Sequence, residues 1–141
     1  MTVSQRPIET DATRTAADAL EACNRHDVDA LARLVSEDVG FDNPVTGPTD
    51  RAGMLAFHRA LFAGFPDIDY QATRLTTEGD RTVAECHING SHLGTYAGVP
   101  PTGRRLSVGA AFVISVRGGL IASWRSYFDR VPVLRVLGRI E

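Results

Sequence analysis

A chain of 141 residues, of which 43% are hydrophobic and 23% charged, is long enough for one domain with a real hydrophobic core. Its formal net charge of −2 supplies no basic field, so we expect neither nucleic acid nor a membrane surface as a partner. The N-terminus lacks a signal-type apolar segment and no apolar run reaches membrane-spanning length, so the sequence predicts a soluble, cytoplasmic protein.

The cysteines and histidines predict neither a disulfide framework nor a metal site. Cys23 and Cys86 are too few and too far apart for either, and both fall on apolar faces, so we expect them to be reduced core residues. The four histidines lack metal-ligand spacing and have no acidic cluster beside them. Among them, His26 is interpreted as a surface loop residue.

The first half of the chain predicts helices. Residues 1–12 form a polar, flexible segment, and residues 13–141 a single domain. Helical periodicity covers residues 13–24 and, after a cap at Asp27 or Asp29, a short stretch through Val35. A short strand at residues 39–43 precedes a third helix at about 51–64, capped by Thr49 or Asp50, whose apolar stripe includes His58.

The second half predicts strands. Residues 68–77 and 81–91 form one pair, and a glycine- and proline-rich loop at 94–103 leads into a second pair spanning residues 106–129. Gly118-Gly119 supplies the positive φ angles of the tight turn in that second pair, and residues 132–140 form a closing helical turn. Helices followed by an antiparallel meander indicate an α+β fold with helices on one face of the sheet.

Five segments carry a resemblance to a known family: NRHD at 24–27, LFAGFPD at 61–67, GSHLG at 90–94, GVPPTGR at 98–104 and WRSYFD at 124–129. From about Ala16 to Gly138, the sequence resembles the SnoaL-like polyketide cyclase group of the nuclear-transport-factor-2-like superfamily. The resemblance implies a cone-shaped, curved antiparallel or mixed sheet wrapped over three N-terminal helices, a cystatin-like α+β barrel. It also implies ring closure without a cofactor, using an aspartate as acid and base.

The sequence departs from the related limonene epoxide hydrolase pattern. Asn43 is retained, but Phe41 stands where the family tyrosine is expected, and Ser126 stands where a catalytic aspartate is expected. The apolar positions of residues 83–89 offer no replacement for the missing arginine and second aspartate. Epoxide hydrolysis by that route is therefore not expected.

Two candidate catalytic residues remain, Asp129 and His58. Desolvation in an apolar pocket would raise the pKa of a carboxylate such as Asp129 toward working pH, but strict alternation places Asp129 on the strand face opposite Trp124 and Ser126. His58 would point between its helix and the sheet as a base or a hydrogen-bond donor. The alternatives are a buried histidine satisfied by one hydrogen bond, and an aspartate paired with a nearby arginine.

The remaining candidates are substrate-binding residues, with Asn43 or Ser126 donating a hydrogen bond to a developing oxyanion. Asn43 is also compatible with ordinary turn chemistry, and His92 with fixing its own loop. The full set of expected substrate-binding positions is Asn43, Phe62, Tyr70, Cys86, His92, Phe112, Trp124 and Ser126.

The sequence therefore predicts a homodimeric, cofactor-independent cyclase or isomerase acting on a hydrophobic, carbonyl-bearing small molecule. A non-catalytic binding or accessory protein is the first alternative, and a hydrolase or dehydratase using a water held by Asn43 is the second. A cavity of roughly 300 Å³ or more beside His58, with a carboxylate or Asn43 in reach, would favour the enzyme. A histidine held by a backbone carbonyl, with Asp129 outside, would favour the binding protein.

Overall fold

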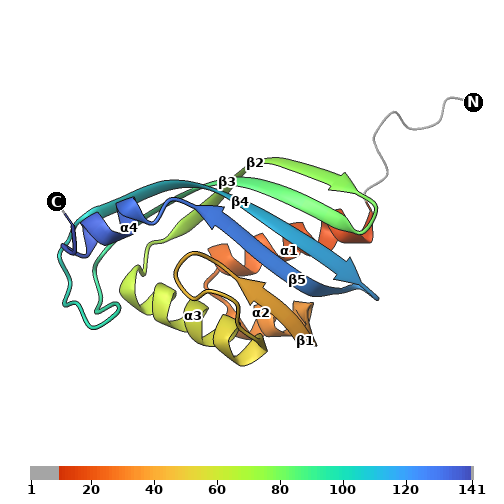
Figure 1. Ribbon diagram of the computed structural model, residues 1–141, viewed down its shortest axis with the longest axis horizontal. Helices are drawn as coiled ribbons and strands as arrows, with labels where there is room; N and C mark the ends of the chain where they lie inside the picture. Colours follow the sequence, from red (N-terminus) through yellow and green to blue (C-terminus); the bar gives the residue numbers. More distant parts are fainter. Residues whose placement is uncertain (1–9, 141) are drawn as a thin grey trace, which may run out of the picture.

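The computed structural model describes residues 10–140, which form four helices and one five-stranded sheet (Figure 1). The elements in chain order are α1 (Asp11–Asn24), α2 (Val28–Leu34), β1 (Val35–Asp42), α3 (Arg51–Gly64), β2 (Asp69–Glu78), β3 (Arg81–Ser91), β4 (Arg105–Arg117), β5 (Leu120–Phe128) and α4 (Val131–Val136). Residues 1–9 of the segment expected to be flexible lie outside the described residues, and α1 begins within the remainder of that segment.

The sheet has the strand order β1-β5-β4-β3-β2. Strands β2 to β5 form an antiparallel meander, whereas β1 runs parallel to β5. The expected α+β class with a mixed sheet is therefore confirmed. The sheet stays open, with β1 and β2 as its edges, so it does not close into the barrel that the resemblance implied.

Helices α1, α2 and α3 lie along one face of the sheet, and its long strands bend over them (Figure 1). Side-chain caps decide where these helices begin. Asp27, rather than Asp29, caps α2 by accepting from the Ala30 amide at 2.9 Å, and Asp50 caps α3 by accepting from the Gly53 amide at 2.9 Å. Helix α3 has the bounds that its apolar stripe predicted.

Two local predictions differ in outcome. Gly118 and Gly119 have φ angles of +60° and +78°, as the tight hairpin between β4 and β5 requires. The first strand, in contrast, begins at Val35 rather than at residue 39, because Val35 already pairs with Ile121 of β5. Helix α2 thus ends one residue earlier than periodicity predicted, because the β-branched, buried Val35 belongs to the strand.

The last residue of α1 and the loop that follows it hold the edge strand β2 in place. The Asn24 side chain donates to the Tyr70 carbonyl at 2.9 Å and accepts from the Tyr70 amide at 2.7 Å. His26 Nε2 donates to the Ile68 carbonyl at 2.8 Å, and its ring stacks on Phe62 at a centroid distance of 4.5 Å. His26 is therefore not the simple surface residue that the sequence suggested, and the loop fixes where Tyr70 enters the core.

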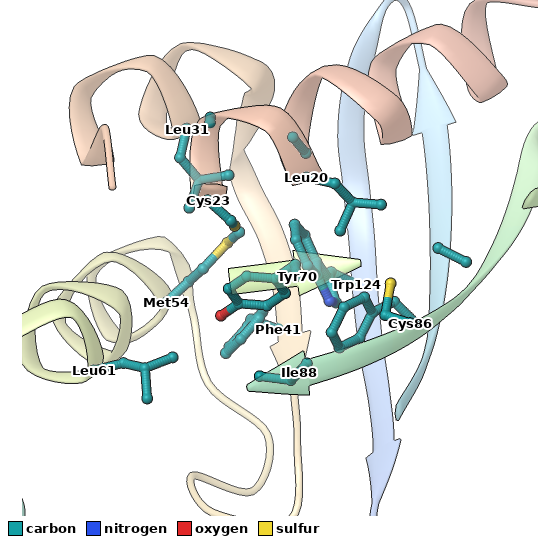
Figure 2. Packing of buried hydrophobic residues seen from close by; sticks show 14 of the residues in the cluster. Leu20, Cys23, Leu31, Phe41, Met54, Leu61, Tyr70, Cys86, Ile88 and Trp124 are labelled. Atoms are coloured by element: carbon teal, nitrogen blue, oxygen red, sulfur yellow. The ribbon is translucent and has the colours of Figure 1, made fainter. Parts of the chain in front are cut away.

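The core lies between the helices and the inner face of the sheet. Figure 2 shows Phe41, Tyr70, Ile88 and Trp124 converging there from four different strands, with Met54 and Leu61 opposite them on α3. No helix among residues 10–140 is both long and apolar enough to cross a lipid bilayer.

Candidate functional site

An apolar cavity of about 60 Å³ lies between α3 and the inner face of the sheet; we call it the central cavity. Three polar residues, Asn43, His58 and Ser126, share its wall with aromatic and aliphatic side chains. The apolar lining consists of Phe41, Val45, Phe57, Leu61, Phe65, Ile68, Tyr70, Ile88, Tyr96, Leu106, Val108, Phe112, Trp124, Phe128 and Val133. A mainly apolar wall with a few polar groups is typical of a small-molecule site.

His58 is buried in the cavity wall and carries one hydrogen bond. Its Nδ1 lies 2.8 Å from the carbonyl oxygen of Met54, one helical turn earlier, so Nδ1 carries the proton and donates it. Nε2 lies on the far side of the ring and has no hydrogen-bond partner among residues 10–140. The ring therefore offers an unused acceptor on the side away from its helix backbone.

Burial keeps this histidine neutral. It lowers the pKa of His58 from 6.5 to about 4, and the hydrogen bond to Met54 opposes that change only in part. The aromatic rings of Phe41, Phe57 and Trp124 surround the imidazole at centroid distances between 5.3 and 6.0 Å. At neutral pH the Nε2 lone pair is thus available.

Asn43 presents the complementary group. Its Oδ1 accepts from the amides of Val45 and Thr46 at 2.8 and 2.9 Å and from the Thr46 hydroxyl at 3.3 Å, which closes the loop after β1. These three donors identify the oxygen and leave Nδ2 as the free end of the amide. Nδ2 has no partner among residues 10–140, so it remains a donor on a side chain that lines the cavity.

Strand β5 contributes a second donor. Trp124 Nε1 donates to Ser126 Oγ at 3.1 Å, which leaves the hydroxyl proton of Ser126 unused. The hydroxyl group of Tyr70 adds a third donor, and burial raises the pKa of Tyr70 well above its ordinary value, so it stays protonated. The polar groups of the cavity are thus several donors and one unused acceptor, His58 Nε2.

The structure places the predicted site residues in three groups. The residues that line the central cavity are His58, Asn43, Tyr70, Phe112, Trp124 and Ser126. Phe62, Cys86 and His92 are buried but do not line it. Asp129 lies outside, because β5 alternates regularly from Ser123 to its end and its outward parity continues from the exposed Tyr127.

Asp129 is exposed, and its Oδ1 accepts from the Val131 amide at 2.9 Å at the start of α4. It therefore makes a turn contact. The ion pair with a nearby arginine, which was the alternative expectation, does not form with any arginine of residues 10–140. No carboxylate lines the central cavity, and no group of three or more metal-ligating side chains occurs within residues 10–140.

His92 fixes its own loop. Its Nδ1 accepts from the Thr102 amide at 3.2 Å, and its ring stacks on Phe65 at 5.4 Å. Its Nε2 is buried and has no partner in the described part of the chain. The Thr102 hydroxyl donates in turn to the Val136 carbonyl at 3.1 Å and so ties the 94–103 loop to α4. The contacts of His92 therefore indicate a structural role in holding the loop, and not a contact with the cavity.

Sequence reasoning missed three residues at one end of the cavity: Val45, Tyr96 and Val133. Each belongs to a different segment outside the sheet, namely the loop after β1, the 94–103 loop and α4. None of these segments has a strand or helix periodicity long enough to predict an inward face. Ile88 and Val108, in contrast, were detectable from the alternation of β3 and β4.

An open, curved, mixed sheet bent over three helices around an apolar cavity is the architecture of nuclear-transport-factor-2-like proteins. The chain belongs to the SnoaL-like polyketide cyclase family, whose model matches residues 14–137. No curated protein sequence matches it.

Solved structures agree with this assignment. IdmH from Streptomyces antibioticus, described as a candidate polyketide cyclase, is 30% identical at a TM-score of 0.78, over 92% of this chain and 99% of that one. AclR from Streptomyces galilaeus, described as a candidate hydroxylase, is 21% identical at a TM-score of 0.84, over 94% and 84%. An NTF2-like protein of unknown function from Cytophaga hutchinsonii is 17% identical at a TM-score of 0.67, over 93% and 99%. At these low identities the last two show the fold alone.

Proposed function

We propose that this protein binds a hydrophobic, carbonyl-bearing, polyketide-like small molecule with its reacting part at the central cavity and acts on it as a cofactor-independent cyclase or isomerase. The family and the description of IdmH support a cyclase-type role. The observation that carries the proposal is the pairing of one unused acceptor, His58 Nε2, with unused donors on Asn43 and Ser126 in an apolar wall.

In the proposed mechanism, His58 Nε2 removes a proton from the carbon next to a substrate carbonyl. The electron pair of that C–H bond becomes an enolate, whose oxygen accepts hydrogen bonds from Asn43 Nδ2 and Ser126 Oγ. The Nδ1–H bond to Met54 keeps the ring in the tautomer that leaves Nε2 free.

The second half of the reaction returns the proton. In a ring closure, the enolate carbon attacks a second carbonyl, a carbon–carbon bond forms, and the new alkoxide takes the proton from His58. In an isomerisation, His58 returns the proton to a different carbon of the conjugated enolate. A pKa of about 4 makes His58 a weak base but makes its imidazolium a strong acid, which favours this return step.

A model ketone tests this assignment. We would incubate the protein with 1-tetralone in deuterated buffer and follow exchange of the α-hydrogens by NMR. His58→Phe keeps an aromatic ring but removes Nε2, so the exchange rate is expected to fall at least about 100-fold. His87→Gln is the matched control, because His87 lies on the outer face, bonded to Ser107 at 2.9 Å. Unchanged exchange in His58→Phe would refute the role of His58.

A non-catalytic binding protein is the second candidate. It is favoured by the small cavity, by the contact of His58 with a backbone carbonyl, and by the position of Asp129 outside the cavity. Binding of 1-tetralone, detected by the fluorescence of Trp124, without any exchange above the buffer rate would identify this function. A hydrolase using a water held by Asn43 is disfavoured, because three donors already occupy Oδ1 and it cannot also take a proton from water.

We also propose that the outer face of the sheet forms a homodimer interface. This face is left uncovered by the helices in Figure 1, and its centre carries the small residues Gly109 and Ala111 beside Tyr127, which is 53% exposed. Light scattering after gel filtration is expected to give the mass of a dimer, and Tyr127→Lys the mass of a monomer. A monomeric wild-type protein would exclude the interface.

A further inference from the structure

A second hollow adjoins the central cavity at the end where sequence reasoning failed. This outer hollow has a volume of about 180 Å³ and is lined by Val45, Tyr96, Ala97, Val133 and two arginines, with Leu134 and Leu137 of the α4 region below them. Val45, Tyr96 and Val133 line both spaces. These three side chains are therefore the partition between the central cavity and the outer hollow.

The central cavity is too small to enclose a polyketide-like ligand. Its 60 Å³ is well below the roughly 300 Å³ or more of ordinary ligand pockets, and also below the about 150 Å³ of a cavity that holds benzene, so it accommodates only part of an aromatic ring. A ligand that places the edge of a ring in the central cavity must therefore continue past the partition. Because the partition is shared with the outer hollow, the remainder of the ligand lies there.

The outer hollow is electropositive. Arg130, at the start of α4, is exposed and has no hydrogen-bond or ion-pair partner among residues 10–140. Arg139 donates through Nη2 to the Ala97 carbonyl at 2.7 Å, which holds its guanidinium at the rim while its other N–H groups stay available. Among residues 10–140, no carboxylate lines the hollow, and the neighbouring Asp129 is engaged with the Val131 amide.

The partition is held by packing. Tyr96 lies in a tight turn in which it exchanges backbone hydrogen bonds with Val99 at 3.0 and 2.9 Å, and its ring meets Phe65 edge-on at 5.5 Å. Its Cβ would lie 2.7 Å from a Cβ placed on Gly64, so the close approach of the turn to the end of α3 needs a glycine there. Tyr96 is thus fixed against α3 as one wall of the passage.

We propose that the ligand of this site is an amphipathic acid, whose apolar ring reaches into the central cavity by its edge and whose carboxylate is bound by Arg130 and Arg139 in the outer hollow. The proposal rests on the proposed function, because it requires the central cavity to bind the apolar part. It adds the chemical class of the ligand and the direction in which the ligand lies.

A matched pair of probes tests it: 4-phenylbutanoate, and 4-phenylbutanamide as the neutral form of the same skeleton. The edge of the phenyl ring would enter the central cavity, and the fluorescence of Trp124, the single tryptophan, would report binding of both probes. The acid is expected to bind about 3- to 10-fold more tightly than the amide, because two partly exposed charge contacts contribute modestly.

The variants are Arg130→Gln with Arg139→Gln, and Arg117→Gln as the control at the end of β4, which lies at the opposite end of the molecule from α4 (Figure 1). Glutamine keeps a donor for the Ala97 carbonyl. The double variant is expected to lose the preference for the acid while binding the amide as before, and the control to keep the preference.

Equal binding of acid and amide by the wild-type protein would overturn the proposal and leave the proposed function standing. A preference for the acid that survives in the double variant would also overturn the proposal and leave the proposed function standing, since the carboxylate would then be bound elsewhere. Failure of both probes to bind would refute the apolar site itself, and with it both the proposed function and this inference.

Discussion

Replacing His58 by glutamine should change how the stability of the protein depends on pH. In the folded protein the pKa of His58 is lowered to about 4 by burial, whereas in the unfolded chain it has its ordinary value of 6.5. Above pH 6.5 the ring is neutral in both states and contributes no pH dependence. Between pH 6.5 and about 4, only the unfolded chain takes up the proton, so stability falls as the pH falls.

The size of the effect follows from the two pKa values. The difference between 6.5 and about 4, at 1.36 kcal/mol for each pKa unit, corresponds to a loss of about 3 kcal/mol once the pH is below both values. At pH 4.5 most of this loss has already occurred, roughly 2 to 3 kcal/mol. The group is buried, so solvent does not screen the effect away.

Urea unfolding at pH 7.5 and at pH 4.5, followed by the fluorescence of Trp124, measures it. Glutamine at position 58 does not titrate and keeps a donor for the Met54 carbonyl, while every other titrating group remains. On acidification from pH 7.5 to pH 4.5, the free energy of unfolding of the wild type should therefore fall by roughly 2 to 3 kcal/mol more than that of the variant. A difference that stays constant within about 0.5 kcal/mol would show that folded His58 takes up its proton normally, and the argument would fail.

Three further substitutions test separate parts of the structure. Asn24→Ala removes both hydrogen bonds to the backbone of Tyr70 and should lower the free energy of unfolding by about 2 kcal/mol in urea titrations. Gly94→Ala places a Cβ against a carbonyl oxygen of α3 and should lower the free energy of unfolding by about 1–3 kcal/mol. Gly109→Ala has open space at its Cβ and should lower it by no more than about 1 kcal/mol, so equal losses in the two variants would contradict the packing at Gly94. Asn43→Asp keeps the acceptor that closes its loop but removes the Nδ2 donor, so α-hydrogen exchange in 1-tetralone should slow about 100-fold, and an unchanged rate would remove Asn43 from the mechanism.

The helices and the hairpin were predictable because their signals are local. Asp50 caps α3 by contacting a residue only three positions away, and Gly118-Gly119 needs nothing beyond its own backbone to form a turn. The start of β1 was not predictable in this way. Val35 joins the sheet because of a partner in β5, and a single sequence does not reveal that pairing.

In the candidate site, too, local signals were predictive and contacts between distant segments were not. Alternation along β5 correctly separated Trp124 and Ser126 from Asp129, and the structure follows it to the end of the strand. The family resemblance favoured an aspartate as acid and base, whereas the cavity lining contains His58 instead. The residues of the partition, such as Tyr96, are placed by contacts between segments far apart in sequence, which periodicity does not encode.

The parallel pairing of β1 with β5 also determines when the cavity is completed during synthesis. Phe41 of β1 and Trp124 of β5 are neighbours in the sheet, with ring centroids 6.0 Å apart, although they belong to opposite halves of the chain. On the ribosome β1 emerges early and has no partner strand until β5 has been translated, so this contact is among the slowest to form. A nascent chain that ends before Leu120 therefore lacks one wall of the cavity and exposes the unpaired edges of both β1 and β4.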